Sequence, residues 1–242
     1  MPHHVEHDSE GLPIPNRIKA KPVKRPGQIV AAIIVVIFAA MIVKGLITNP
    51  RFEWNVVWKY LFNERVLEGV GYTLLLTVIS MVVAIVLAVV LAVMRKSVNP
   101  VLRGVSWFYI WFFRGTPVYT QLVFWGLFAV LIPRLSLGIP LTSVEFWSID
   151  SQAIITAFNA AWIGLALNEA AYLAEIVRAG LDAVDPGQEE AAKALGMKRS
   201  MIMRRVILPQ AMRIIIPPTG NETIGMLKTT SLVLAVPFTL DL

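Results

Sequence analysis

The sequence contains no cysteine, and its three histidines lie at positions 3, 4 and 7, within a polar N-terminal stretch. Without cysteine the chain has no disulfide, no cysteine-ligated metal and no thiol nucleophile, and the placement of the histidines excludes a buried histidine site. Charge is scarce too, because 16% of the 242 residues are charged and 56% are hydrophobic. A soluble domain is usually about a quarter charged, so this chain has too little charge to cover a water-facing surface.

Long uncharged runs are abundant instead. Several can cross the ~30 Å hydrocarbon core of a bilayer, which predicts an all-α, polytopic helical membrane protein. We expect about five spans, at residues 29–47, 69–94, 116–133, 151–174 and 207–238. An aromatic segment ending at Arg114 is expected to lie at the interface before the third span. Five spans that begin inside end outside, so either a last span is missing or the chain ends there naturally, and the sequence leaves both open.

The remaining segments predict the domain organisation. Residues 1–28, with five prolines, are expected to form a disordered cytoplasmic tail, and residues 29–48 an additional N-terminal span. Residues 49–68 combine aromatic side chains with interspersed charge, which is typical of an extracytoplasmic segment at the headgroup level. Residues 69–242 are expected to form the main transmembrane domain, with a charged loop at 182–209.

Basic residues predict the orientation. The tail, residues 95–114 and residues 178–205 together carry 15 lysines and arginines, whereas residues 44–68 and 134–150 carry 5. Because cytoplasmic loops carry the excess of basic residues, the N-terminus and the charged loop are predicted to be cytoplasmic. The net charge of +6 then reflects topology and anionic lipid, with no nucleic-acid partner.

The charged loop has the signals of two short helices. "PGQEEAAKALG" has Asp185 as an N-cap, Pro186 in the first turn and Gly196 as a left-handed stop. A second helix, "RSMIMRRVI", leads to Leu208 and Pro209. Two readings are open: a knob with an exposed alanine face that enters a partner's groove, or a solvated loop.

The spacing within this loop resembles the EAA loop of type I ABC importer permeases. The matching positions are Glu190, Ala191, Ala192, Gly196, Val206, Leu208 and Pro209. Val206 stands where isoleucine is commoner. "FFRGTP", "LNEAAYLAEIVRAGL", "LPQAMRIIIPPTGNE" and "LKTTSL" are similar to the polar amino acid branch of that family, and the likeness covers roughly residues 66–242.

The resemblance implies a permease subunit of an ATP-driven importer of a polar amino acid, located in a bacterial cytoplasmic membrane. It implies as partners a dimer of ABC ATPase subunits, a second permease (identical or homologous) and an extracytoplasmic amino-acid-binding protein. The EAA loop would dock into the ATPase. Since the chain has no GxxxxGK[ST] phosphate loop, we expect no enzyme activity and no cofactor in this chain, with ATP and magnesium on the partner.

Polar groups at membrane depth are candidates for the substrate pathway, because they usually face a cavity or a partner. Asn168 and Glu169 lie late in the fourth span, and Glu169 could take a substrate ammonium while Asn168 bonds its carboxylate; an interhelical bond is the alternative. Pro217, Pro218 and Gly220 are expected to break the fifth span. Thr219, Asn221 and Glu222 could then line the pathway, and Lys228 could pair with Glu222, or the break could be purely structural. Nearer the cytoplasm, Glu175 and Arg178 could form an interfacial pair, and Arg114 could anchor to lipid phosphate.

Two other functions compete with the importer reading. Glu169 and Glu222 could bind an ion or proton in an ion-coupled secondary transporter or channel subunit. The EAA spacing argues against this, since an ion-coupled carrier needs no ATPase docking knob. An inactive scaffold is the third possibility, should the last span be naturally absent.

Overall fold

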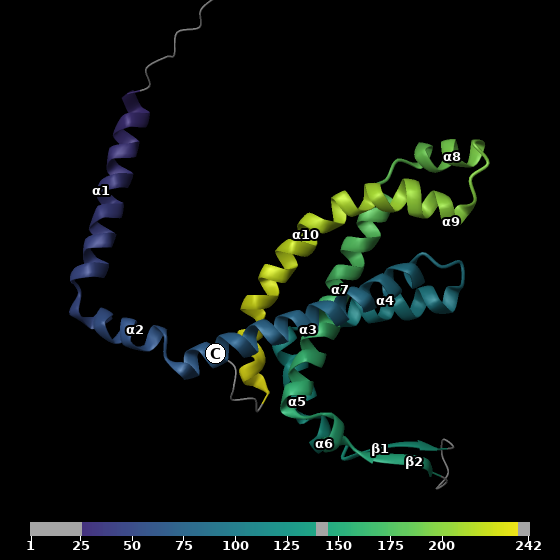
Figure 1. Cartoon of the computed structure of the whole chain (residues 1–242), viewed down its shortest axis with the longest axis horizontal. Helices are drawn as coiled ribbons and strands as arrows, with labels where there is room; N and C mark the ends of the chain where they lie inside the picture. Colours follow the sequence, from purple (N-terminus) through teal and green to yellow (C-terminus); the bar gives the residue numbers. More distant parts are fainter. Residues whose placement is uncertain (1–25, 139–144, 237–242) are drawn as a thin grey trace, which may run out of the picture. The chain divides into compact units, whose positions relative to one another are not determined.

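The computed structural model describes residues 26–138 and 145–236 (Figure 1). Nearly all of the predicted tail, residues 1–25, therefore lies outside the described residues. The chain divides into a first unit, Met1–Trp58, and a main unit, Lys59–Leu242.

The first unit contains α1 (Pro26–Thr48), η1 (Pro50–Phe52) and the start of α2 (Trp54–Leu61). Its predicted span lies within α1, which begins three residues earlier than expected and buries none of its residues. Twenty-three residues extend for roughly 35 Å at ~1.5 Å per residue, enough to cross a bilayer. Asn49 caps η1 by accepting a hydrogen bond from Arg51 N, and Trp54 Nε1 donates to the Leu46 carbonyl oxygen at 2.8 Å.

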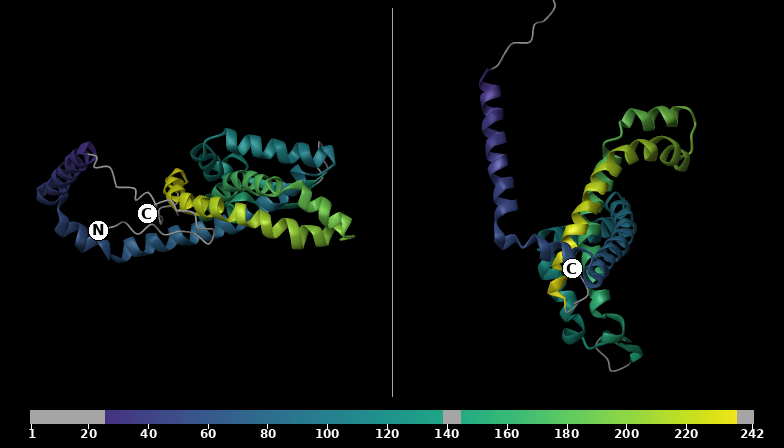
Figure 2. Two further views of the ribbon diagram at one scale, coloured as in Figure 1. Left: turned by 90° about the horizontal axis from the view of Figure 1, so that it is seen from above. Right: turned by 60° about the vertical axis from the view of Figure 1, so that its left-hand side comes forward.

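The main unit is a helical bundle with one small hairpin. Its long helices are α3 (Glu64–Arg95), α4 (Pro100–Gly115), α5 (Val118–Leu131), α7 (Ala157–Asp182) and α10 (Leu208–Thr229). Its shorter elements are β1 (Arg134–Gly138), β2 (Glu145–Asp150), α6 (Ser151–Ile154), α8 (Pro186–Ala194), α9 (Arg199–Ile202), η2 (Met203–Ile207) and η3 (Thr230–Ala235). The β1–β2 hairpin and the α8–α9 segment lie at opposite ends of this unit in both Figure 1 and the right view of Figure 2.

Helices α3 and α7 form the centre of the bundle. Small residues recur every fourth position on the buried face of each helix: Ser80, Ala84, Ala88 and Ala92 on α3, and Ala166, Ala170 and Ala174 on α7. Such stripes let two backbones approach closely, which is how helices associate where lipid supplies no hydrophobic driving force. Larger side chains, among them Leu76, Leu122, Leu165 and Leu173, fill the space around the stripe.

Helix α4 differs from its prediction as an interfacial helix that precedes a span. It lies against α3 and α7: buried Ser106 donates its hydroxyl to the Leu91 carbonyl oxygen, and Tyr109 donates to that of Leu167, both at 2.8 Å. Its large aromatic residues face outward, with Trp107, Phe108 and Trp111 at least half exposed. Aromatic density alone suggested the interface, but the opposite face of the helix packs in the bundle. Helices α4 and α5 follow each other directly, with a break at Thr116 and Pro117.

The segment predicted as a loop at 134–150 contains an antiparallel hairpin. β1 pairs with β2 in the register Arg134↔Asp150 to Gly138↔Glu145, with an irregularity at Leu137/Gly138. Residues 139–144 lie outside the described part of the chain. At its base, Ser151 N donates to the Pro133 carbonyl oxygen at 2.9 Å.

Within the described residues, three helices are long and apolar enough to cross a membrane: α1, α3 and α7. Helix α5 is apolar but shorter, and α10 contains Arg213, Glu222 and Lys228. The fourth predicted span starts later than expected, because the Thr156 hydroxyl accepts from Asn159 N and caps α7. Helix α7 also continues beyond the predicted end at residue 174, to Asp182.

Close approach of α7 and α10 yields a stability prediction. A Cβ at Gly180 would lie 3.0 Å from Ile215 Cδ1, closer still to Cγ1, and 3.4 Å from the Ala211 carbonyl oxygen. Gly180→Ala should therefore overpack this contact and cost roughly 1–3 kcal/mol. Thermal unfolding in detergent, followed by tryptophan fluorescence, should show a midpoint lowered by several degrees.

Gly104→Ala in α4 is the matched control, since no heavy atom lies within 4 Å of its added Cβ. Its midpoint should stay the same or rise slightly, because alanine favours a helix over glycine. Equal midpoints for the two variants would contradict the close α7–α10 approach.

Candidate functional site

A polar cavity of about 520 Å³ lies where the α4–α5 break meets α7 and α10. Its size falls in the range of small-molecule sites. Its polar side chains come from three parts of the chain: Arg114 and Thr116 at the break, Asn168, Glu169 and Tyr172 on α7, and Glu222 and Thr229 on α10. Of the five predicted pathway residues, the structure thus brings together Asn168, Glu169 and Glu222.

Of the two readings left open for Asn168, the structure shows the interhelical bond. Its Nδ2 donates to the Phe113 carbonyl oxygen at 3.0 Å and to Gln121 Oε1 at 3.2 Å. Gln121 Nε2 in turn donates to Phe113 O, Thr116 O and Thr116 Oγ1, at 3.0, 3.1 and 2.7 Å. Because the protein already uses the amide donors of Asn168, they are not free to bind a substrate carboxylate. The network instead holds the α4–α5 break open beside the cavity.

Glu169 is the buried carboxyl group of the cavity. Only 7% of the residue is exposed, and its Oε1 has no hydrogen-bond partner among the described residues. Glu222 adds a second carboxylate from α10, and Arg114 supplies a cation whose guanidinium lies over the Tyr172 ring at 5.3 Å. A buried carboxylate is costly unless it is paired. The cavity is therefore suited to a ligand that brings positive charge.

The expected break in the fifth span was wrong. Helix α10 continues through Pro217 and Pro218 as a regular α-helix. The prolines remove two donors, and the Thr219 hydroxyl bonds the neighbouring carbonyl, that of Ile215, at 2.8 Å. Thr219 and Asn221 do not line the cavity, and Asn221 is exposed.

Arg114 and Tyr172 are site residues that sequence reasoning missed, since Arg114 was interpreted as a lipid anchor and Tyr172 was not singled out. The FFRGTP segment signals a helix break, but nothing local shows that its arginine reaches a tyrosine 58 positions later. A predicted pair of Lys228 with Glu222 is not observed within the described residues. Six residues apart on a helix place two side chains on different faces.

The second candidate site is the helical hairpin formed by α8 and α9 (residues 186–202), called the α8–α9 hairpin. Its local signals act as predicted. Asp185 Oδ1 accepts from Gly187 N at 2.7 Å, and Gly196 is left-handed with φ +74°. Gly196 N donates to Lys193 O and Met197 N to Ala192 O, the pair of bonds that defines a Schellman stop. The turn is therefore fixed by its backbone.

Helix α9 continues into α10 without a gap, through the π-helical turn η2. Leu208 N donates to the Met203 carbonyl oxygen, five residues back, directly before Pro209. Proline has no N–H to continue the ladder, and a single π turn accommodates one extra residue within a helix. Gln210 Nε2 donates to the Val206 carbonyl oxygen at 2.9 Å. The α8–α9 hairpin is therefore connected to α10 by continuous helix.

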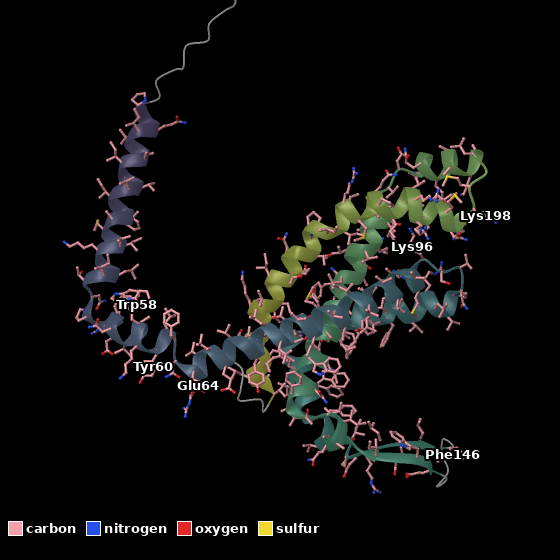
Figure 3. All side chains as sticks on the ribbon, viewed as in Figure 1. Trp58, Tyr60, Glu64, Lys96, Phe146 and Lys198 are labelled. Carbon is pink, nitrogen blue, oxygen red and sulfur yellow. The ribbon has the colours of Figure 1, made fainter. Side chains whose placement is uncertain are left out.

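Half of the predicted alanine face is exposed. Glu190, Ala191, Gly196, Leu208 and Pro209 are exposed, whereas Ala192 is buried where α8 packs on α9. Leu195, an apolar residue at the tip, is 81% exposed, and Lys198 lies at the same end of the unit as Lys96 (Figure 3).

Lys193 bonds Glu189 at 2.8 Å, which lowers the pKa of that carboxyl below its ordinary value. Glu189 therefore stays ionised at neutral pH.

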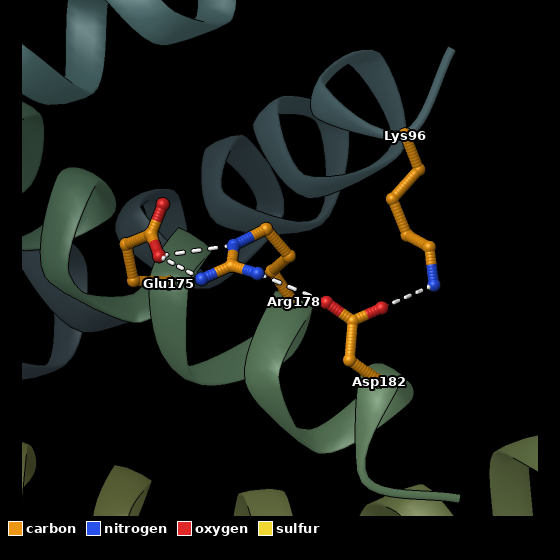
Figure 4. Close-up of polar contacts among 4 residues, drawn as sticks. All are labelled: Lys96, Glu175, Arg178 and Asp182. Carbon is orange, nitrogen blue, oxygen red and sulfur yellow. Dashed lines mark hydrogen bonds and ion pairs between the residues drawn. The ribbon is translucent and has the colours of Figure 1, made fainter. Parts of the chain in front are cut away.

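An ion-pair chain connects the base of the hairpin to α3 (Figure 4). Lys96 Nζ contacts Asp182 Oδ1 at 2.7 Å, Asp182 Oδ2 contacts Arg178 Nη1 at 2.9 Å, and Arg178 Nη2 contacts Glu175 Oε2 at 2.6 Å. The Glu175–Arg178 pair is confirmed as predicted, and Lys96 and Asp182 extend it. The four side chains are between 23% and 46% exposed, so the pairs orient the helix ends more than they stabilise them.

The contrast between Asn168 and Glu169 can be tested by stability. Asn168→Leu would leave Gln121 Oε1 without its donor and would remove one of the two donors to Phe113 O, so it should destabilise the protein by roughly 1–3 kcal/mol. Glu169→Gln removes a charge without removing a bond to Oε1, so its unfolding midpoint in detergent should stay level or rise. A large loss of stability in Glu169→Gln would show that the carboxylate is a structural group.

Comparison with known proteins identifies the family of the chain. Residues 84–237 match the family described as "Binding-protein-dependent transport system inner membrane component". The chain is 53% identical to the Arginine transport system permease protein ArgU of Corynebacterium glutamicum, over 94% of this chain and 70% of that protein. It is 37% identical to the Arginine transport system permease protein ArtQ of Bacillus subtilis, over 71% and 70%.

A solved structure gives the same answer. The chain matches one titled "Crystal structure of an amino acid ABC transporter with histidines" with a TM-score of 0.60 and 36% identity, over 76% of this chain and 77% of that one. These relationships decide against the ion-coupled transporter or channel that Glu169 and Glu222 left open. The chain belongs to the family of binding-protein-dependent transport system inner membrane components, and within that family it is a permease subunit of the amino acid ABC transporters.

Proposed function

We propose that this permease subunit carries a positively charged amino acid, such as arginine, through the polar cavity. The carrying observation is the buried Glu169 carboxylate, whose Oε1 lacks a partner among the described residues. A cationic side chain would balance Glu169 and Glu222, and the substrate carboxylate would pair with Arg114. Two of the relatives are named for arginine transport, which supports this choice.

Energy for transport would come from a separate dimer of ABC ATPase subunits that holds ATP and magnesium. The α8–α9 hairpin would enter a groove of the ATPase. Its exposed residues Glu190, Ala191 and Gly196 would contact the walls of that groove. Closure of the ATPase dimer would push this hairpin, and the continuous helix through η2 would pass the displacement to α10 and Glu222. The chain itself is a transport component and not an enzyme.

A complete importer would add a second permease, identical or homologous, and an extracytoplasmic amino-acid-binding protein. We assign the chain to a bacterial cytoplasmic membrane with its N-terminus inside, because lysine and arginine are concentrated in the tail, at 95–114 and in the hairpin region. The β1–β2 hairpin, at the opposite end of the main unit, would then face the binding protein.

Substrate charge selection is tested by uptake into proteoliposomes that hold the assembled transporter. Glu169→Gln and Glu222→Gln should each reduce labelled-arginine uptake about tenfold or more, since each removes a charge-assisted contact. Glu68→Gln, at an exposed position of α3 outside the cavity, is the control and should transport normally. If both cavity variants take up arginine at the wild-type rate, the cavity is not the cation-binding site.

Coupling is tested by co-purification with the ATPase. Glu190→Lys reverses an exposed charge, and Gly196→Trp places a bulky side chain at a left-handed position; both should abolish the complex while membrane insertion stays normal. Glu145→Lys and Gly104→Trp are the matched controls, the latter because no heavy atom lies near the added side-chain position. A complex that survives in Glu190→Lys and Gly196→Trp would exclude docking through this hairpin.

A further inference from the structure

A second polar cavity, of about 610 Å³, lies where α3 ends and α4 begins, beside the last turns of α7. Four basic side chains line it, Arg95, Lys96, Arg103 and Arg178, with only two acidic ones, Glu175 and Asp182. The ion-pair chain of Figure 4 uses both carboxylates to compensate Lys96 and Arg178. Within the described part of the chain, Arg95 and Arg103 have no carboxylate within ion-pair distance. The cavity thus keeps an excess of two positive charges.

This cavity lies directly at the end of an apolar surface. The uncharged run of α3 extends from Gly69 to Met94, and Val93, next to Arg95, is 63% exposed. A basic pocket at that position would lie at the headgroup level of a bilayer, because the hydrocarbon boundary is expected where apolar residues give way to charged ones.

An aromatic cavity continues the basic one. A neighbouring hollow of about 510 Å³ shares Arg95 and Glu175 with it and is lined by Trp107, Ile110 and Trp111. The two tryptophan rings stack at 6.1 Å between centroids and are 50% and 58% exposed. Tryptophan favours the headgroup level of a bilayer. A charged pocket that opens onto an apolar, aromatic one has the two-part character of a phospholipid.

We propose that the pocket around Arg95 and Arg103 binds the headgroup phosphate of an anionic phospholipid, with the glycerol and first acyl carbons on Trp107 and Trp111. The basic pocket shares no lining residue with the substrate cavity, whereas the aromatic hollow shares Arg114, Gly115 and Tyr172 with it. Because Lys96 and Arg178 belong both to the pocket wall and to the ion-pair chain, the lipid phosphate would lie against the contact that joins α3 to α7.

The test uses the full chain in phosphatidylcholine nanodiscs. Phosphatidylglycerol with brominated acyl chains is titrated in, and quenching of tryptophan fluorescence is compared with that by brominated phosphatidylcholine. Because the chain has 7 tryptophans, the signal from Trp107 and Trp111 must be separated from that of the other five. The quenching that disappears in a Trp107→Phe/Trp111→Phe variant is the part that comes from the site. Half-maximal quenching at a mole fraction about tenfold lower for phosphatidylglycerol is expected, given the contribution of each basic residue near anionic lipid.

Arg95→Gln/Arg103→Gln should abolish this preference, whereas Arg95→Lys/Arg103→Lys should keep most of it. The control Arg51→Gln/Arg134→Gln removes the same charge at exposed positions elsewhere and should leave the preference intact. Equal quenching by the two lipids in the wild type, or an unchanged preference in the Arg→Gln variant, would overturn the proposal. Binding of soluble glycerol 3-phosphate in place of lipid would assign the pocket to a free phosphate and would equally overturn it.

Discussion

The close packing of α3 against α7 is the constraint on which the rest of the bundle depends. Alanine and serine at every fourth position bring the two backbones together, and this pair forms the surface on which α4, α5 and α10 pack. Membrane helices gain little from burying leucine, because lipid is equally apolar. Dispersion contacts between backbones must supply the attraction instead. The residues that line the cavity need not hold the helices together, because the α3–α7 contact does so elsewhere on α7. The cavity can therefore be polar.

The polar cavity lies at the break between two consecutive helices, α4 and α5. At the α4–α5 break the backbone leaves regular hydrogen bonding, which a membrane protein tolerates only where other groups satisfy the freed carbonyls. Gln121 and Asn168 do this for Phe113 and Thr116. The same break directs Arg114 toward the carboxylates of α7 and α10. Asn168 and Glu169 are neighbours in the sequence but have different surroundings. The amide of Asn168 is bonded to the α4–α5 break, whereas Glu169 Oε1 has no partner among the described residues.

Sequence reasoning succeeded where the signal lies within a few residues. The Asp185 cap, the Gly196 stop, the Glu175–Arg178 pair and the apolar runs of α1, α3 and α7 depend only on local spacing. It failed where partners are far apart. Asn168 meets Gln121 across 47 positions and Lys96 meets Asp182 across 86, and no local rule connects them. The prolines of α10 misled because a local rule predicts a break, whereas the helix continues through both of them.

The π turn at η2 has a consequence for how much the length of this segment can vary. Successive helical residues turn by about 100°, so the count of residues between Gly196 and Pro209 sets the angular phase of the hairpin relative to α10. Removing one residue would let η2 relax to an ordinary α-helical turn, leaving both helices intact but rotating the exposed edge of α8 away from its former direction. The number of residues between Gly196 and Pro209 therefore sets the direction in which the exposed edge of α8 points. A partner that binds this edge would be sensitive to insertions or deletions here, even where they disturb no contact within the chain.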